Sequence, residues 1–417
     1  MFNLSNLSKF QRQTRNKVSK QVQKNTKKWR PFQATDFQSL MYPCFILCYI
    51  FGIFPYKIDD STFKISKSRY IMSTVTICAV CIYQFKIYYD LYILNITKKI
   101  NFNEVSNSIE NNFYYIFSSF IVIITYILSN PRMRLLQTIM EVSSHISPKS
   151  YQKLSNLIHF KDIFGFLLLI VLMLISYIQL ELDYALMLFS IYIGTIVYQM
   201  DMLYVNCVCI LKICFKTVRD NLANLREPAM NDVHIYYKQE NSFLLMELKA
   251  LKKQHLIISD TVQMLNLVFS LQLLTSVIIV FIEITFNFYF LMLKWPGFTS
   301  KLYEHWLYII IIYQFAKFLL IIWVCETGKN EALEIGTTVH VVFNSTSDER
   351  VKYELRLFSL QILHRKNVFS AKAFNIDVAL LAAIIGNITT YILILIQFQL
   401  ISNSCEGKST NNITQII

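Results

Sequence analysis

Long apolar runs alternate with polar segments along the whole chain. A helix that crosses a bilayer needs about 20 mostly apolar residues. Eight apolar runs can be distinguished: Leu40–Pro55, Tyr70–Leu91, Phe113–Ser129, Ile163–Leu180, Tyr184–Phe215, Leu265–Leu293, Trp306–Val324 and Val378–Ile401. The first is the shortest and holds Pro43, Gly52 and Pro55, which is typical of a re-entrant or interfacial helix. The pattern predicts an all-α membrane protein with seven transmembrane helices.

Composition agrees with this prediction. Of the 417 residues, 54% are hydrophobic and 16% are charged, whereas a soluble domain carries about 25% charged residues. An ordinary soluble enzyme is therefore excluded. The 9 Cys lie mostly inside apolar runs, where a thiol behaves as a small hydrophobic group. The spacing of Cys78 and Cys81 is better explained by packing than by metal or redox chemistry, and no metal or cofactor is expected.

The positions of Lys and Arg predict the orientation in the membrane. The formal net charge is +13, and basic residues gather before the first run and after the first, third, fifth and seventh runs. Basic loops stay on the cytoplasmic side. The first run therefore does not cross, the N-terminus lies inside and the C-terminus lies outside. The basic N-terminal arm is read as a cytoplasmic tail beside anionic lipid, in preference to a nucleic-acid-binding segment.

The last apolar run carries a stripe of polar residues. Asn387, Thr390, Ile394 and Gln397 recur at helical spacing and share one face of an otherwise oily helix. Polar residues inside a membrane mark either a contact between helices or a water-filled pathway. One helix cannot enclose a pore, but several copies around a common axis can. From the residues alone, a polar seam and a pore lining are equally favoured.

The stretch from Thr390 to Phe398 reads Thr-Tyr, five hydrophobic residues, Gln-Phe. It resembles the signature of the insect gustatory receptor family, and it stands in the last span, as in that family. The opening from Phe32 to Tyr56 and the basic segment before the last span are also similar. The resemblance implies a plasma-membrane receptor, not an enzyme. Such a receptor is a four-subunit, ligand-gated, non-selective cation channel that shares the fold of insect odorant receptors.

The resemblance also implies roles for particular parts of the chain. The signature helix lines the pore, and Gln397 and Phe398 form its narrowest part, with Ile394 below them. The expected division is a cytoplasmic tail (1–36), a re-entrant or interfacial helix (37–56), six transmembrane helices with a ligand pocket in their outer half (57–348), a cytoplasmic anchor helix (349–377), the pore-lining helix (378–401) and an extracellular tail (402–417). The subunits form a homotetramer or a heteromer with related receptors.

The segment from Glu349 to Leu363 is amphipathic. Val351, Leu355, Phe358 and Ile362 recur at helical spacing, with charged residues between them, and this predicts a helix with one apolar face. It either covers its own subunit or forms the anchor at which subunits meet. We favour the anchor, because the chain has little other soluble mass.

Polar and aromatic residues near the predicted outer ends of the spans are candidates for binding a small tastant, either an amino acid, a sugar or a bitter compound. The candidates are Gln179, Asp183, Tyr184, Tyr192, Glu283, Asn287, Tyr303, Trp306, Tyr313 and Gln314. Tyr114 and Tyr115 open the second span nearby. An interfacial aromatic belt explains any single Tyr or Trp equally well. Glu283 is harder to explain in that way, because an acid inside a span is costly without a partner; Lys317 is a candidate partner.

Two other classes of protein are alternatives to a receptor channel. His255 and Asp260 match the His-four-Asp spacing of membrane acyltransferases, but no Gly-rich companion motif follows. A secondary transporter is the other alternative, although no internal repeat is evident. Both are less favoured than a receptor channel that binds a small tastant, conducts cations and lies in a lipid bilayer.

Epitope tags test the predicted orientation. An antibody should reach a tag at Ile417 in intact cells and a tag at Met1 only after permeabilisation, because basic loops remain inside. Of the glycosylation sequons, only those headed by Asn95 and Asn412 should carry glycan, since they are predicted to lie outside. Detection of both ends on the same side of the membrane would contradict the seven-span map.

Overall fold

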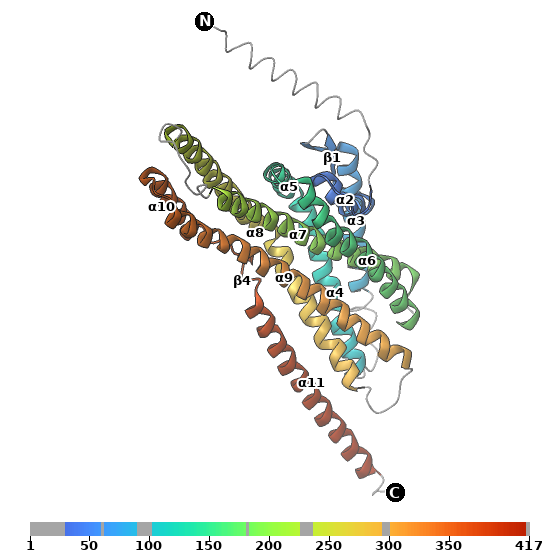
Figure 1. Cartoon of the computed structure of the whole chain (residues 1–417). Coiled ribbons are helices and arrows are strands. Elements are labelled where there is room, and N and C mark those ends of the chain that lie inside the picture. Colours follow the sequence, from blue (N-terminus) through green and yellow to red (C-terminus); the bar gives the residue numbers. More distant parts are fainter. Residues whose placement is uncertain are drawn as a thin grey trace.

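The computed structural model describes residues 30–59, 62–89, 102–180, 183–225, 237–293 and 301–413. The described part is almost wholly helical (Figure 1). Its elements are α2 (Phe37–Ile50), β1 (Tyr56–Asp59), β2 (Thr62–Ile65), α3 (Lys67–Tyr89), α4 (Phe102–Ile127), α5 (Ser129–Ser143), α6 (Pro148–Leu180), α7 (Tyr184–Asn224), α8 (Tyr237–Leu293), α9 (Lys301–Ser345), α10 (Glu349–His364), β3 (Ser370–Ala371), β4 (Phe374–Asn375) and α11 (Val378–Ile413). The strands form two antiparallel two-stranded hairpins. The predicted all-α fold is confirmed.

The helices account for the predicted number of spans. In the described residues, six helices are each long and apolar enough to cross a membrane, namely α3, α6, α7, α8, α9 and α11. The count becomes seven when the pair formed by α4 and α5, which is bent by 67°, is taken as one span. The break falls at Leu128, just before Pro131. Proline has no N–H to bond to the carbonyl four residues earlier, here that of Ile127, and its ring clashes with that carbonyl.

The first apolar run forms the short helix α2, which contains Pro43. Its 14 residues extend about 21 Å, which is less than the hydrocarbon thickness of about 30 Å. The helix begins at Asp36, whose carboxylate accepts a hydrogen bond from the Ser39 backbone N–H at 2.8 Å. Helix α2 is therefore too short to cross the bilayer, as the sequence predicts.

Helix α7 forms the centre of the bundle. Every residue from Ile193 to Leu211 is buried, because α2, α4, α5, α6, α8 and α9 all pack against it. A helix that is buried on all sides has no solvent or lipid face. Cys207 and Cys209 are among its buried residues, which agrees with their predicted role as small packing groups.

Two buried ion pairs hold this centre together. The Lys317 Nζ of α9 lies 3.3 Å from Asp201 Oδ2 of α7, and the Ser276 hydroxyl of α8 donates to Asp201 Oδ1 at 2.6 Å. A second pair joins Lys161 to Asp162. Buried charges are tolerated only when they are paired. Lys317, which the sequence offered as a partner for Glu283, is thus engaged by Asp201 instead.

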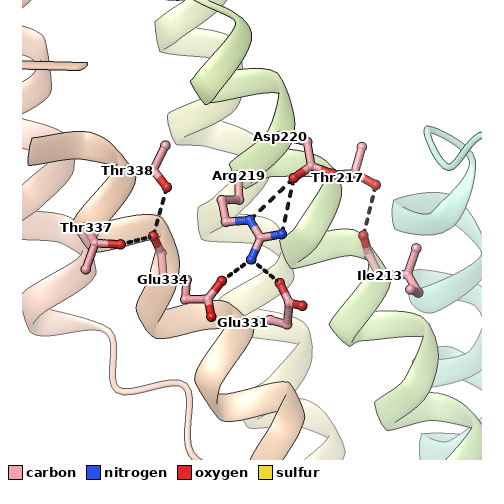
Figure 2. Close-up of polar contacts among 8 residues, drawn as sticks. All are labelled: Ile213, Thr217, Arg219, Asp220, Glu331, Glu334, Thr337 and Thr338. Carbon is pink, nitrogen blue, oxygen red and sulfur yellow. Dashed lines mark hydrogen bonds and ion pairs between the residues drawn. The ribbon is translucent and has the colours of Figure 1, made fainter. Parts of the chain in front are cut away.

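Helices α7, α8 and α9 continue past their apolar parts and pack together at the end predicted to be cytoplasmic. Figure 2 shows Arg219 of α7 between Glu331 and Glu334 of α9; the Arg219–Glu331 distance is 2.8 Å. Helix α10 buries Val351, Leu355 and Phe358 against α8 and α9. The predicted amphipathic helix is therefore present.

The Glu354 carboxylate of α10 is tied to α8 by Lys252, whose Nζ donates a hydrogen bond at 2.7 Å. This bond lowers the pKa of Glu354 below its ordinary value. A carboxyl group with a lowered folded-state pKa stabilises the fold above its unfolded pKa, and this contribution is lost as the pH falls through the lowered value. The contact is therefore fully present at neutral pH.

Breaking the Asp201–Lys317 pair should destabilise the bundle. We expect Lys317→Met or Asp201→Asn alone to cost about 3–5 kcal/mol, because each leaves an uncompensated buried charge. The double variant should recover most of that loss, because it removes both charges. Thermal unfolding of the purified protein in detergent measures the difference.

Lys329→Met is the matched control, since Lys329 pairs with Glu326 at 3.1 Å in a more exposed setting and should contribute about 0–1 kcal/mol. Equal losses for Lys317→Met and Lys329→Met would show that the buried pair is unimportant.

Candidate functional site

A cavity of about 340 Å³ lies between α4, α6, α7, α8 and α9, toward the ends that the loop charges place outside. Its polar lining consists of two acids (Glu110, Glu283), three amides (Asn111, Asn287, Gln314) and two serines (Ser176, Ser190). The other lining residues are five aromatic ones (Tyr114, Tyr115, Phe290, Trp306, Tyr313) and five apolar ones (Leu169, Leu172, Met173, Leu307, Ile310). Mostly apolar walls with a few convergent polar groups are typical of a small-molecule site.

Four polar residues of the cavity form one hydrogen-bonded chain. Asn287 Nδ2 donates to Glu110 Oε1 at 3.2 Å and to the Glu283 backbone carbonyl at 2.6 Å. The Gln314 side chain donates to Glu283 Oε2. Glu283 is only 9% exposed. The chain links α4, α8 and α9 and fixes both carboxylates beside the cavity.

Hydroxyl and indole groups complete the walls. Trp306 Nε1 donates to the Ser176 hydroxyl at 3.1 Å, and the hydroxyls of Tyr115 and Ser190 share a hydrogen bond of 3.0 Å. The buried hydroxyl of Tyr313 has no hydrogen-bond partner among the described residues, whereas the Tyr114 hydroxyl interacts with the Ser118 hydroxyl of the same helix. A buried polar atom without a partner is costly, so the Tyr313 hydroxyl is available to a bound molecule.

The cavity brings together five of the ten residues that the sequence suggested for ligand binding. They are Glu283, Asn287, Trp306, Tyr313 and Gln314. Asp183 and Tyr184 are exposed at the start of α7 and do not line it. Tyr192 does not line it either, since it borders a separate small pocket and its hydroxyl donates to the Phe51 carbonyl at 3.1 Å.

Several predictions fall on parts of the chain outside the described residues. The side chains of Gln179 and Tyr303 are among them, as are Asn95 and the side chain of Asn412. The tags and glycans discussed above concern these segments, and those statements remain predictions.

The sequence missed some lining residues, of which Glu110 is the most important. Its position before the apolar run of the second span suggested a residue of the outer loop. Helix α4, however, begins at Phe102, so Glu110 lies within the helix. The spacing between Glu110 and Tyr114 is the signal that could have found it, because residues four apart share one helical face.

Helix α11 turns one face to the bundle and leaves the other exposed. Ile384 and Ile388 are buried, and Ile392 and Leu395 are partly buried. The exposed residues include all five of the predicted pore group: Asn387, Thr390, Ile394, Gln397 and Phe398. At 100° per residue, the predicted stripe lies about 135° around the helix from the buried face. The stripe therefore does not point toward the neighbouring helices of its own chain, α8 and α9.

The cavity wall and α11 are in contact. Leu395 packs against a cluster that contains Phe290, Trp306 and Leu307, and these three residues also line the cavity. One turn earlier on α11, the Tyr391 ring meets Phe281 of α8 edge to face, with 5.7 Å between centroids. The cavity and α11 thus share the side-chain layer that this cluster forms.

Comparison with known proteins identifies the class of protein. Residues 41–402 match the family described as 7tm chemosensory receptor. This match covers most of the chain, and the chain belongs to the 7tm chemosensory receptor family. The resemblance noted from Thr390–Phe398 is confirmed.

Similar curated proteins come from Drosophila melanogaster. The chain is 32% identical to gustatory receptor 28b over 152 residues, which is 34% of this chain and 32% of that protein. It is 47% identical to gustatory receptor 2a over 62 residues, or 15% of this chain and 14% of that protein. The matched stretches therefore span about a third or less of these two relatives.

A solved structure shares the fold. The olfactory receptor OR5 of the insect Machilis hrabei aligns with a TM-score of 0.64 and 14% identity, over 87% of this chain and 98% of that chain. A structure of the same receptor in complex with eugenol aligns with the same TM-score. These alignments support the multi-pass membrane fold.

Membership of this family identifies the chain as a receptor and excludes the acyltransferase alternative. The geometry agrees, since His255 Nδ1 accepts a hydrogen bond from Gln361 at 3.0 Å and Asp260 pairs with Arg365 at 2.9 Å. His255 and Asp260 of α8 thus hold the C-terminal end of α10 in place, through Gln361 and through Arg365, the residue that follows the helix.

A larger side chain at Gly194 of α7, next to two residues that line the cavity, should weaken ligand binding. A Cβ added at Gly194 would lie 2.7 Å from Met173 Cε and 3.0 Å from the Tyr114 hydroxyl, so both lining side chains must shift. We expect Gly194→Ala to raise the half-maximal ligand concentration by about tenfold, which corresponds to ~1.4 kcal/mol and lies within the usual cost of overpacking.

The measurement is a concentration–response curve. Gly336→Ala serves as the control, because its added Cβ would meet only Ile362 at 3.8 Å. An unchanged half-maximal concentration in Gly194→Ala would mean that the ligand does not occupy this cavity.

Proposed function

We propose that the chain is a subunit of a ligand-gated, non-selective cation channel that detects a small polar tastant or nutrient. The observation that carries the proposal is the exposed polar stripe of α11, a helix that packs against the same side-chain cluster that walls a cavity with convergent polar groups. The ligand enters the cavity, and α11 lines the pore together with the same helix of neighbouring subunits.

The pore proposal rests on the chemistry of the exposed face. Phe398 is 63% exposed and Ile394 is 42% exposed in the single chain, beside the amide of Gln397. Four copies around an axis present four amides, which replace part of an ion's hydration shell. A ring of Ile or Phe side chains closes such a path by excluding water. Asp377 caps the start of the helix, because its carboxylate accepts a hydrogen bond from the Leu380 N–H at 3.0 Å.

The anchor proposal rests on a second apolar face of α10. Tyr353 is 60% exposed, Leu360 52% and Leu363 72%, although the opposite face of the helix is packed against α8 and α9. Exposed apolar side chains that gather on one surface commonly mark a protein–protein interface. We infer that this face meets the neighbouring subunit on the cytoplasmic side, in a homotetramer or a heteromer with related receptors.

Coupling between the two sites follows from the shared side-chain layer. A ligand that contacts Trp306 and Phe290 changes their packing against Leu395, and Leu395 stands on the helix that lines the pore. The ligand opens the channel to the extent that it binds this rearranged packing more tightly than the resting one.

Cysteine substitution along α11 tests the pore lining. Charged thiol reagents should block the evoked current when Cys replaces Asn387, Thr390, Ile394 or Gln397, and should have little effect when it replaces Ile384 or Ile388. This expectation follows from the two faces of the helix. Whole-cell current in transfected cells is the measurement.

A matched pair of truncations refines the test. Gln397→Ala should change ion selectivity or leak current, whereas Leu395→Ala should mainly raise the ligand concentration needed for opening, since it removes packing against the cavity wall. Block that is uniform along the helix, or absent from the polar stripe, would overturn the pore proposal.

A further inference from the structure

We propose that the cavity recognises an organic cation, namely a protonated amine carried on an aromatic or apolar body. The inference rests on the proposed ligand-binding role of the cavity and narrows its ligand class. It favours an amine over the neutral sugars and zwitterionic amino acids that the sequence left open.

The charge of the cavity favours a cation. Glu110 and Glu283 both line it, and none of the described lining residues is Lys, Arg or His. The nearest identified cation, Lys317, acts on Glu283 through space, but its ammonium group lies 3.3 Å from Asp201. The hydrogen bonds that Asn287 and Gln314 give to the acidic pair are neutral. A carboxyl group shielded from water either takes up a proton or needs a positive partner, and a cationic ligand supplies that partner to both acids.

The aromatic wall of the cavity also favours a cation. Tyr114, Tyr115, Trp306 and Tyr313 all line the cavity, and a cation is attracted to the faces of such rings. The buried hydroxyl of Tyr313 lacks a partner among the described residues, and its oxygen can accept an N–H bond from an ammonium group. This hydroxyl points to a ligand independently of the two acids.

The same features disfavour the other ligand classes. The carboxylate of an amino acid would share the cavity with Glu110 and Glu283 without a positive side chain to bind it, and like charges repel. A sugar can bond to the amides and hydroxyls, but it offers no positive charge to the two acids.

A series of probes that differ in one group separates these classes. Tyramine, tyrosol, tyrosine and 3-(4-hydroxyphenyl)propionate share a phenolic ring and carry a cation, a neutral hydroxyl, a zwitterion and an anion. A second series replaces the phenol by phenyl. Each probe is applied to cells that express the full chain, and to the purified receptor in a thermal-unfolding assay.

We expect the amines to raise the unfolding temperature and evoke current at concentrations at least tenfold below those of the alcohols. The zwitterion and the anion should be inactive. Glu283→Gln and Glu110→Gln should each weaken the amine response about tenfold and remove the preference for amine over alcohol. Glu283→Asp, which keeps the charge, should retain that preference.

Asp183→Asn is the matched control. It removes one negative charge at the exposed start of α7, outside the cavity, and should leave the amine preference unchanged. All variants are compared at equal surface expression, so a folding defect is not mistaken for lost binding.

The two proposals fail in different ways. Amines that stabilise the purified receptor without evoking current would overturn the channel proposal and support the ligand class. Alcohols or zwitterions that act as well as the amines would overturn the ligand class and leave the channel proposal standing. Amines that neither stabilise the protein nor evoke current would also overturn the ligand class.

Discussion

The buried pairing of Asp201 with Lys317 is the contact on which the rest of the bundle depends. It lies about 25 Å along α7 and α9 from their predicted outer ends at 1.5 Å per residue, where no bulk water is available to solvate a charge. Both side chains are nearly inaccessible, and Ser276 adds a third helix to the contact. A charge at this depth must find its partner within the protein, so the pair fixes the register of α9 against α7 and α8.

That register also positions the cavity. Gln314 lies one helical turn from Lys317 on α9, and it bonds to Glu283 on α8. If α9 shifted by one turn along α7, both the ion pair and this bond would be lost. The apolar side chains between the helices tolerate such a shift more readily, because dispersion contacts have little directional preference. Charge pairing therefore supplies the specificity that hydrophobic packing lacks.

Helix α11 exposes polar side chains in the single chain. Its Ile face is packed against the bundle, whereas Asn387, Thr390 and Gln397 stand exposed on the other side. Amide groups are poorly accommodated in lipid hydrocarbon. This imbalance supports an assembly in which the polar faces of several copies meet around water, and the exposed apolar face of α10 gives the same copies a place to join.

Local pattern predicted much of this architecture. The apolar runs anticipated the helices that can span the membrane, the brevity of the first run anticipated α2, and the spacing of Val351, Leu355 and Phe358 anticipated α10. The stripe on α11 was also visible, because helical periodicity assigns each residue to a face. Half of the suggested ligand residues line the cavity, since polar groups near span ends are few.

The rest depended on how helices meet, which periodicity does not encode. Glu110 joined the cavity because α4 begins earlier than its apolar run. Tyr192 bonds to Phe51 outside the cavity, and Lys317 paired with Asp201 instead of Glu283. Spacing along one helix determines which side chains share a face. Only the packing of separate helices at a particular register determines which of those side chains come within bonding distance.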